Sequence, residues 1–332
     1  MTFTPALLAR LEQHLTAALP NWQLPFDTRI ELLTTSENAT FLAHCPQTGR
    51  RRVLRLHRPD YHTRAEIESE LAWLATLRAD TRLQVPLPLA TTGPSPVVEL
   101  ALDDRRFYAV GFDFIEGQAP QADDTLVAWF EKLGALTATL HEHSRRWTPP
   151  GNFVRTRWHL DSMIGPHGLW GDWRRAHGLT AADERVIARA IERIHRVIGV
   201  YDRLPGRYGL VHADLRLANL LVENDQLAVI DFDDCGFCWY AFDFAAAISF
   251  FELDPLIPRL RQAWIRGYRA VAAFDADDVA MLDTFIMIRR IMLSAWLATH
   301  AESHTARSLG EGFIEGTATL ARGYLNLAHT SK

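Results

Sequence analysis

Lysine is nearly absent from this sequence. Only Lys132 and Lys332 occur among the 332 residues, so arginine supplies almost all of the positive charge. A mechanism that requires a lysine in the first third of the chain is therefore excluded. Cysteine is also scarce, and three cysteines, an odd number in a chain of this length, do not form a disulfide framework.

Long apolar runs are missing as well. No stretch approaches the ~20 uninterrupted apolar residues of a membrane span. The N-terminus has no basic segment followed by an apolar core, so a secretory signal is not expected. The net charge of −5 at pH 7 gives no sign of the strongly basic face that nucleic-acid binding usually needs. We therefore expect a cytoplasmic protein with no nucleic-acid or membrane partner.

The hydrophobic pattern divides the chain into a strand-rich first third and a helical remainder. After an amphipathic helix at the N-terminus, strands are expected at 28–45 (two, around a polar turn), 51–59 and 105–117, with a helix at 63–80. Later helices are expected near 123–143, 183–202, 241–252, 255–273, 276–302 and 311–328. Since strands dominate the first third and helices the remainder, the expected fold class is α+β. Because 332 residues are more than one hydrophobic core usually serves, we expect two lobes. These are a small β-rich lobe at 1–112, a hinge at 113–117 and a larger, mainly helical lobe at 118–332.

Residues 229–240, VIDFDDCGFCWY, combine three carboxylates with a Cys-x-x-Cys pair. Taken alone, this stretch allows a metal site made of carboxylates, a metal or redox site made of thiols, or a polar turn. A zinc site needs about four N or S ligands, and the only other cysteine is Cys45, in the other lobe. A redox pair would normally open a helix in a βαβ unit, and none precedes Cys235 and Cys238. The pattern therefore favours cysteines packed behind a loop of carboxylates.

The stretch HADLRLAN, residues 212–219, lies upstream of Asp231 in the same predicted strand–turn–strand unit. Two adjacent strands joined by a tight turn bring their ends together, so Asn219 and Asp231 are expected to meet. An amide oxygen and a carboxylate suit Mg²⁺, which prefers few protein ligands and completes its shell with water and phosphate. Asp214 then lies beside the metal, where it can orient a hydroxyl and accept its proton during phosphoryl transfer.

HADLRLAN followed by VIDFDD resembles the catalytic signature of kinases, H-x-D-L-x-x-x-N followed by a metal-binding Asp. The absence of Phe-Gly after this Asp, with an acidic residue close behind, is similar to the aminoglycoside phosphotransferase and choline kinase-like family. The segments SENATFLAH, RRVLRLHRP and ESELAWLATL resemble the branch that contains bacterial stress-response kinases and type II homoserine kinases. The resemblance covers about residues 28–250. It implies a protein-kinase-like bilobal fold with ATP and Mg²⁺ as cofactors.

The resemblance implies a role for each matched residue of the catalytic block. Asp214 would be the catalytic base, and Asn219 and Asp231 the Mg²⁺ ligands. His212 would support the catalytic loop. Asp243, in the segment AFDFAAA, would brace the same loop.

The resemblance also places the hinge that contacts adenine. Its backbone would be that of Asp113, Phe114 and Ile115, and Gly117 would free the chain to turn.

In the small lobe, the kinase lysine that contacts the α- and β-phosphates falls at Arg55. Arginine can clasp phosphate oxygens in a bidentate way but differs from lysine in reach and shape. Glu70 is its expected partner, because Ile67 and Leu74 lie on the same helical face and turn it inward. The stretch TTSENATF lacks the glycine-rich loop, so the phosphates would be capped by Ser36 and Asn38.

Two further groups of residues keep more than one interpretation. One set of rings either packs in the core or binds a cationic amine acceptor: Trp158, Trp170 and Trp173. One set from the last third either lines an acceptor pocket or packs: Arg289, Arg290, Trp296 and His300.

Together the residues predict an ATP- and Mg²⁺-dependent phosphotransferase whose acceptor is the hydroxyl of a small metabolite, such as an amino alcohol, a hydroxy amino acid or a sugar. The alternative is a Ser/Thr protein kinase of the stress-response type, because the branch that the sequence resembles includes both. A nucleotide-binding regulator with little catalysis is a further alternative. It is supported by Arg55 and the missing glycines, and opposed by the intact set of Asp214, Asn219 and Asp231.

Overall fold

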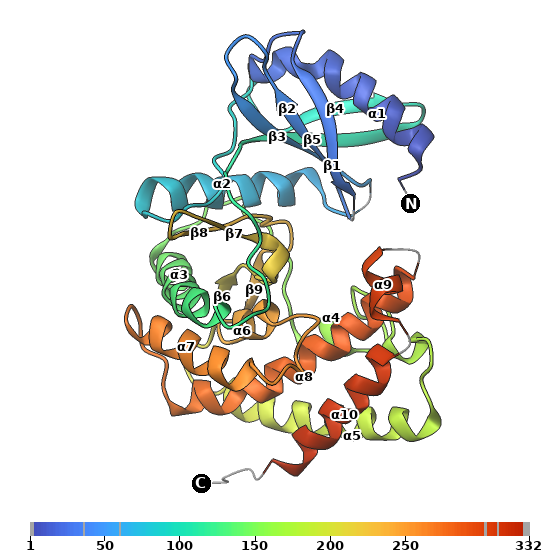
Figure 1. Cartoon of the computed structure of the whole chain (residues 1–332), viewed down its shortest axis with the longest axis vertical. Coiled ribbons are helices and arrows are strands. Elements are labelled where there is room, and N and C mark those ends of the chain that lie inside the picture. The colour runs from blue at the N-terminus through green and yellow to red at the C-terminus, as the bar shows by residue number, and fades with distance from the viewer. Residues whose placement is uncertain (1–2, 36, 60, 302–303, 311, 328–332) are drawn as a thin grey trace. The chain divides into compact units, whose positions relative to one another are not determined.

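The computed structural model describes residues 3–35, 37–59, 61–301, 304–310 and 312–327 (Figure 1). These residues form two compact units. Unit 1 consists of Met1–Gly117, Thr148–Arg155 and Ala228–Asp233. Unit 2 consists of Gln118–Trp147, Thr156–Leu227 and Asp234–Lys332. Unit 1 thus contains both the predicted hinge and the short stretch that carries Asp231.

Unit 1 is built on a five-stranded antiparallel sheet with the order β1-β2-β3-β5-β4. The strands are β1 (Arg29–Thr35), β2 (Ala39–His44), β3 (Arg51–His57), β4 (Val98–Leu102) and β5 (Arg105–Asp113). The strands predicted at 28–45, 51–59 and 105–117 are confirmed, although β5 ends at Asp113. β4 has no counterpart among the predicted strands, because prolines and a glycine at 86–96 obscure the start of its alternating pattern.

The N-terminal helix covers one face of this sheet (Figure 1). Helix α1 (Pro5–Ala18) starts where the hydroxyl of Thr4 accepts a hydrogen bond from the backbone N–H of Leu7. A 3₁₀ turn, η1 (Leu19–Trp22), follows it. Leu11 and Leu15 of α1 are fully buried, in one hydrophobic core with side chains of β2, β3 and β5. The predicted amphipathic helix is therefore confirmed.

Helix α2 (Arg64–Asp80) is the other helix of unit 1, and its predicted position is confirmed. It begins with a reciprocal pair of hydrogen bonds between Thr63 and Glu66, which satisfies two backbone N–H groups of the first turn. Trp73 on its buried face meets Phe232 edge-on, with ring centroids 5.5 Å apart. This contact ties the acidic stretch at the end of unit 1 to α2.

Unit 2 is mainly helical, as predicted. Its helices are α3 (Leu126–Arg146), α4 (Leu160–Ile164), α5 (Ala181–Tyr201), α6 (Phe242–Ala247), α7 (Ile257–Arg269), α8 (Ala276–Thr299), α9 (His304–Leu309) and α10 (Gly312–Asn326). Short 3₁₀ turns lie at η2 (Trp173–Arg175) and η3 (Leu217–Asn219). The predicted helix at 241–252 is too long, because α6 ends at Ala247 and Phe250 adopts a positive φ of 78°. That conformation lies outside the helical region.

Two small sheets belong to the stretch that carries the catalytic motif. β6 (Tyr208–Val211) pairs antiparallel with β9 (Gly236–Trp239). β7 (Leu220–Glu223) and β8 (Gln226–Val229) form a two-stranded sheet, and the chain passes from unit 2 to unit 1 within β8. The predicted order of apolar entry, polar loop, strand, turn and strand is confirmed. β9 is an addition to the prediction.

Helices α3 and α7 cross in direct backbone contact. A Cβ atom on Gly134 would lie 2.0 Å from the carbonyl oxygen of Trp264, and one on Gly267 would lie 1.8 Å from the carbonyl oxygen of Glu131. Any larger residue at either glycine would push the helices apart. This close crossing keeps α3, which carries His141, fixed against the rest of unit 2.

Helix α8 is the central element of unit 2. From Met281 to Ala295 it is buried on almost all sides, and α4, α5, α6, α10 and η2 pack around it. A helix buried in this way is expected to be apolar all round. Instead it contains Arg289 and Arg290, which are therefore candidates for a specific role.

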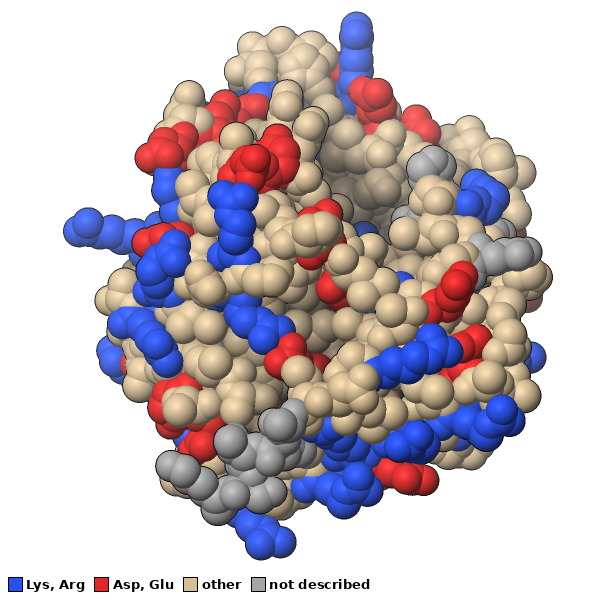
Figure 2. Space-filling model, turned by 60° about the horizontal axis from the view of Figure 1, so that its bottom comes forward, with Lys and Arg blue, Asp and Glu red and all other residues tan. Residues whose placement is uncertain are grey.

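The surface carries both signs of charge. Basic side chains, coloured blue for Lys and Arg, extend outward beside Asp and Glu on the face that Figure 2 shows. Within the part of the chain that the structure describes, no helix is both apolar enough and long enough to cross a membrane.

Candidate active site

The backbone after β6 is strained at the residue before Asp214. Ala213 adopts a positive φ of 69°, which is uncommon for a residue other than glycine. Asp243 compensates for this strain, because its Oδ1 accepts a hydrogen bond from the Ala213 N–H at 2.8 Å and its Oδ2 one from the His212 N–H at 3.3 Å. The structure thus brings His212, Asp243 and the loop together, in the arrangement that the resemblance implies.

Asp243 is itself held in place by a buried chain of hydrogen bonds through His141 to Tyr268. His141 Nε2 lies 2.9 Å from Asp243 Oδ2, and His141 Nδ1 lies 2.9 Å from the hydroxyl of Tyr268. Burial lowers the pKa of His141, although the hydrogen bond to Asp243 opposes this effect. A neutral ring fits both contacts, because Nε2–H then donates to the carboxylate and Nδ1 accepts from the tyrosine.

The Asp214 carboxylate is buried and surrounded by donors. Its Oδ2 accepts hydrogen bonds from Asn219 Nδ2 at 2.8 Å and from Arg216 Nε at 3.1 Å. Its Oδ1 accepts a hydrogen bond from Arg289 Nη2. Burial raises the pKa of Asp214, but the guanidinium groups of Arg216 and Arg289 outweigh this effect and lower the pKa below its ordinary value. The group is therefore an ionised carboxylate at neutral pH, able to accept a proton.

Asn219 lies at the end of the 3₁₀ turn η3, which brings it back to Asp214. Its amide nitrogen donates to both the backbone carbonyl and the carboxylate of Asp214, each at 2.8 Å. The hydrogen-bond network thus assigns the nitrogen to the side that faces Asp214, and the amide oxygen to the opposite side. That oxygen is a hard ligand of the kind that Mg²⁺ takes.

Unit 1 contains a second buried group of charges, centred on Arg55. Its Nη2 lies 2.5 Å from Glu70 Oε2, and its Nη1 lies 3.4 Å from Asp231 Oδ1. Arg55 is 5% exposed and Glu70 is fully buried. Burial lowers the pKa of Arg55, but Glu70, Asp233 and Asp231 outweigh it and raise the pKa. The structure therefore brings the predicted pair together with the predicted metal ligand.

Asp231 also has a strained backbone. It adopts a positive φ of 63°, and its side chain is 39% exposed. Strained residues of this kind persist where the surrounding structure fixes them, and they concentrate at functional sites. Asp231 is the least buried carboxylate of the Arg55 group and therefore the one best able to bind an ion from solvent.

Asp233 has a different environment from Asp231. It is 6% exposed, and His57 Nδ1 and His62 Nε2 each lie 3.5 Å from its carboxylate oxygens. Arg155 donates a hydrogen bond to its backbone carbonyl. Burial raises the pKa of Asp233, but Arg55 and His62 hold the pKa well below its ordinary range. Asp233 thus anchors the stretch that presents Asp231.

The Asn38 side chain is engaged on both ends. Its amide nitrogen donates to Asp233 Oδ2 at 2.8 Å, and its amide oxygen accepts from the Arg58 N–H at 3.3 Å. Contact between Asn38 and a phosphate stays a prediction. Because both ends of the side-chain amide are already hydrogen-bonded, the donor to the phosphate would be the backbone N–H. Ser36 lies outside the described residues.

The predicted hinge begins at a fixed residue. The Asp113 N–H donates to the Leu87 carbonyl at 3.0 Å, and the Asp113 carboxylate accepts from the Leu87 N–H at 2.6 Å. The guanidinium carbon of Arg51 lies over the Phe114 ring, 4.2 Å from the ring centroid. Gly117 has a positive φ of 131°, a conformation that requires glycine. Adenine contact by Asp113, Phe114 and Ile115, and a hinge at 113–117, stay predictions.

The predicted site residues thus fall into two groups. Asn38, Arg55, Glu70 and Asp231 lie together in unit 1, and His212, Asp214, Asn219 and Asp243 lie together in unit 2. The predicted metal site joins Asn219 to Asp231, which belong to different units, so it stays a prediction. In the described part of the chain, no three His, Cys, Asp or Glu side chains are grouped in a way that could hold a metal ion.

The cysteines and tryptophans that kept two interpretations are mostly buried. Cys235 and Cys238 are fully buried, and burial raises the pKa of Cys238 well above its ordinary value, the opposite of a redox-active thiol. Trp158 and Trp173 are 3% and 1% exposed, which supports packing. Trp170 lies against Arg289, with its ring centroid 4.8 Å from the guanidinium carbon.

Two residues of these groups, Arg216 and Arg155, were not singled out by the sequence patterns. Arg216 follows Asp214 by two positions, so its place inside the motif was an available signal. Arg155 gave no local signal, because its partner lies 78 residues away in the chain. Arg289 was singled out, but its bond to Asp214, 75 residues away, was not predicted.

The chain is similar to known proteins over most of its length. The model of the family described as "Phosphotransferase enzyme family" matches residues 30–274, well over half of the chain. Among curated proteins, an uncharacterized protein of Deinococcus radiodurans is 28% identical over 280 residues, which is 81% of this chain and 78% of that protein.

Solved structures show the same fold. A microcompartment-associated aminopropanol kinase is 39% identical with a TM-score of 0.86, over 96% of this chain and 97% of that one. The amicoumacin kinase hAmiN, in complex with AMP-PNP, Ca²⁺ and Ami, is 17% identical with a TM-score of 0.75, over 96% and 94% of the two chains. The prediction of an α+β fold of the kinase type is thereby confirmed. The chain belongs to the phosphotransferase enzyme family, and it is an enzyme that transfers a phosphoryl group to an alcohol.

Proposed function

We propose that this enzyme is a small-molecule kinase that uses ATP and Mg²⁺ to phosphorylate the hydroxyl of an amino alcohol. The observation that carries the proposal is the Asp214 carboxylate, buried, ionised and fixed beside Asn219. The substrate class is supported by the aminopropanol kinase, which is 39% identical over nearly the full length of both chains. A small acceptor is favoured over a protein Ser/Thr, because the kinases named above act on small molecules.

In the proposed reaction the acceptor hydroxyl donates a hydrogen bond to the Asp214 carboxylate. Its proton moves to Asp214 as its oxygen forms a bond to the γ-phosphorus of ATP. The bond between the γ-phosphorus and the bridging oxygen breaks, and ADP leaves with that electron pair. Arg216, held at Asp214 Oδ2, supplies a positive charge beside the transferred group.

The residues present fit a hard divalent cation. The Asn219 amide oxygen faces away from Asp214, and Asp231 offers a partly exposed carboxylate, so both are oxygen donors that suit Mg²⁺. When bound, the ion would neutralise charge on the phosphates. Arg55, held by Glu70, would contact the α- and β-phosphates. That hAmiN was solved with AMP-PNP and Ca²⁺ supports a nucleotide and a divalent cation in this family.

A phosphate-transfer assay tests this function. The purified protein with ATP and Mg²⁺ would be offered 1-amino-2-propanol, 2-aminoethanol, choline, homoserine, an aminosugar and a generic protein substrate. We expect transfer to an amino alcohol and a loss of about 10³-fold or more in Asp214→Asn, as for other essential catalytic groups. Asp225→Asn, at an exposed turn where Asp225 pairs with Lys132, serves as the matched control and should retain the wild-type rate. If phosphate were transferred only to the protein substrate, and this transfer were again lost in Asp214→Asn, the assignment of an amino alcohol as the acceptor would be overturned.

A further inference from the structure

Two consecutive arginines of α8 are buried, whereas most arginines of the chain lie at the surface (Figure 2). Arg289 is 2% exposed and Arg290 is 4% exposed. An arginine cannot lose its charge in a protein, so each needs a partner that compensates for burial. The two side chains point in different directions from the helix, and their partners differ completely.

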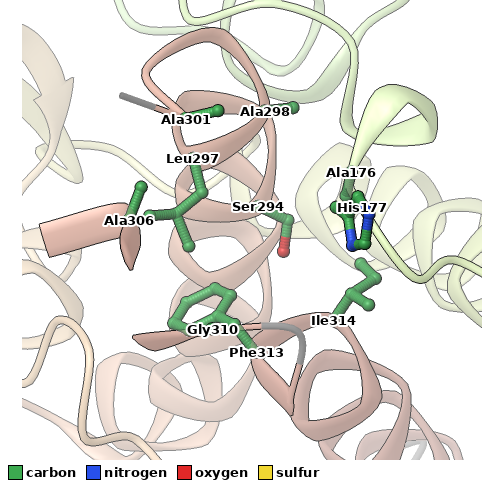
Figure 3. A pocket seen from close by; sticks show the side chains of 10 residues that line it. All are labelled: Ala176, His177, Ser294, Leu297, Ala298, Ala301, Ala306, Gly310, Phe313 and Ile314. Carbon is green, nitrogen blue, oxygen red and sulfur yellow. The ribbon is translucent and has the colours of Figure 1, made fainter. Parts of the chain in front are cut away.

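Arg290 is bound to structural partners. Its Nη1 lies 2.5 Å from Glu252 Oε2, its Nε donates to the hydroxyl of Thr317, and its Nη2 donates to the carbonyl of Phe313. On this side of α8 a mainly apolar cavity of about 230 Å³ lies between α8, α9 and α10 (Figure 3). Ser294, Leu297 and Phe313 point into it. Arg290 therefore fastens α8 to α10.

Arg289 is bound to the catalytic loop instead. Its Nη2 donates to Asp214 Oδ1, and its Nη1 donates to the Ala213 carbonyl at 3.3 Å. Its Nε donates to the hydroxyl of Ser249 at 2.9 Å. The Trp170 ring covers its guanidinium, at 4.8 Å. One side chain thus donates hydrogen bonds to two segments that lie more than thirty residues apart in the sequence.

Both of these segments contain a residue with a strained backbone. Ala213, whose carbonyl Arg289 binds, has a φ of 69°, and Phe250, which follows Ser249, has a φ of 78°. A positive φ is a clear outlier for a bulky residue such as Phe250 and is unfavourable unless the surroundings fix it. Arg289 is the side chain that links the two outliers. It therefore stabilises the loop geometry from which Asp214 projects.

The hydrogen bonds also distinguish the two oxygens of Asp214. Oδ2 already accepts two hydrogen bonds, from Asn219 and Arg216. Oδ1 is bonded to Arg289 alone among the contacts of the described residues. A carboxylate oxygen accepts about two hydrogen bonds, so Oδ1 is the oxygen with capacity for the acceptor hydroxyl.

From this geometry we propose that Arg289 is a positioning residue, which aims Oδ1 of Asp214 at the acceptor hydroxyl. The proposal rests on the proposed function, because it takes Asp214 as the proton acceptor. The hydroxyl would approach Oδ1 beside the guanidinium and Trp170. Arg289 takes no proton and forms no bond in the reaction, and it acts only through the orientation of Asp214.

The neighbouring arginine provides a matched control. Arg289→Lys and Arg290→Lys each keep one positive charge on α8 and remove the planar fork that bonds several partners at once. With 1-amino-2-propanol as the acceptor, we expect Arg289→Lys to lower kcat about 100-fold, because a misplacement of about 1 Å costs a factor of that size. The KM for ATP should stay within about twofold of the wild type. Arg290→Lys should lower Tm and keep kcat within about twofold.

A second comparison shows whether Arg289 acts through Asp214. In the Asp214→Asn background, Arg289→Lys should lower the residual rate by less than about threefold, because groups that act as a unit are not additive. A full additional 100-fold loss would overturn the proposal. An equal fall of kcat in Arg289→Lys and Arg290→Lys, in proportion to Tm, would also overturn it.

Hydrogen exchange tests the positioning without turnover. Arg289→Gln should increase deuterium uptake in peptides that span 211–219, whereas Arg290→Gln should increase it around 252 and 313–317. Unchanged uptake at 211–219 in Arg289→Gln would overturn the proposal, even if the wild type phosphorylated no amino alcohol. An inactive wild type, in contrast, would count against the proposed function alone.

Discussion

Arg55 of β3 and Glu70 of α2 form an ion pair of 2.5 Å from which solvent is almost completely excluded. The pair fixes α2 to the sheet of unit 1. It also holds the Arg55 guanidinium next to Asp231, at 3.4 Å. A buried ion pair stabilises a protein little more than apolar residues of similar volume would. Removing one partner, however, leaves an unpaired buried charge, which strongly destabilises the fold. The relation between the two residues is therefore best tested by removing one of them.

Glu70→Gln should destabilise the protein strongly and weaken nucleotide binding. The substitution leaves the buried Arg55 charge without its nearest partner, which typically costs about 3–5 kcal/mol. Released from Glu70, Arg55 should also turn towards Asp231 and Asp233. We expect a lower free energy of unfolding in urea and a higher Kd for ATP in calorimetry.

Glu68→Gln is the matched control for Glu70→Gln. Glu68 lies on the same helix, with a side chain that is 32% exposed and bonded to Arg64 and Ser95. Exposed pairs of this kind contribute about 0–1 kcal/mol. Equal losses of stability in the two variants would contradict the assignment of Glu70 as the inward partner.

Asp243→Asn should lower kcat more than it raises the KM for ATP. Asparagine keeps one acceptor oxygen but places an N–H₂ group against the backbone N–H of His212 or Ala213. A buried hydrogen bond to a charged group is worth about 1.5–3 kcal/mol, and Ala213 needs its bond to hold a positive φ. Steady-state kinetics beside a urea titration would check both effects. An unchanged kcat in a destabilised variant would limit Asp243 to a role in folding.

Much of this site could be predicted from local sequence patterns, for reasons that concern chain geometry. Glu70 could be assigned to the buried face because helical spacing to Ile67 and Leu74 is a local property. Asp214 and Asn219 could be placed five positions apart in one loop between two strands, although no bond between them was predicted. In both cases the partners are close in the chain, so periodicity and turn chemistry determine which side chains meet.

The remainder depends on contacts that no local pattern encodes. Phe250 continues an apolar run and so predicts a longer α6, yet its positive φ ends any helix there. The segment around it is held by two arginines about 40 residues away, Arg289 through Ser249 and Arg290 through Glu252. For Arg289 itself the sequence leaves open whether it lines an acceptor pocket or packs. Only the packing of α8 on all sides shows that it is buried against Asp214.

The stability of the protein should fall as the pH drops below about 6.5. Burial lowers the pKa of His141, and burial together with Arg55 lowers the pKa of His57 well below its ordinary value of about 6.5. In the unfolded chain these histidines take up protons near pH 6.5, so unfolding binds protons below that pH. Their contribution is complete above pH 6.5 and is lost as the pH falls towards the folded pKa. Each proton taken up contributes about 1.4 kcal/mol per pH unit.

Urea unfolding between pH 7.5 and pH 5 would measure this dependence. His57→Leu removes one of the two titrating rings with a side chain of similar volume, so its slope below pH 6.5 should be smaller than that of the wild type. Equal slopes for the two proteins would show that His57 does not carry the effect.

The cysteine pair should be inert in the native protein. Cys235 and Cys238 are fully buried, and burial raises the pKa of Cys238, so little reactive thiolate is present at neutral pH. Alkylation with iodoacetamide, followed by mass spectrometry, should modify both only after denaturation. Replacing both by alanine should reduce stability and leave kcat near the wild-type value. Rapid modification of the native pair would revive the redox interpretation.

Asn219 and Asp231 should behave as ligands of one Mg²⁺ ion, although they lie in different units. If they share the ion, Asn219→Ala and Asp231→Asn should each raise the Mg²⁺ concentration needed for half-maximal activity. Their effects should also be coupled by at least about 0.5 kcal/mol, because once one ligand is lost the other holds the ion less well. Asp103→Asn, at a surface pair with Arg10, should give purely additive effects with either variant. Additivity of Asn219→Ala with Asp231→Asn would mean that the two residues act on separate steps, and the shared metal site would have to be abandoned.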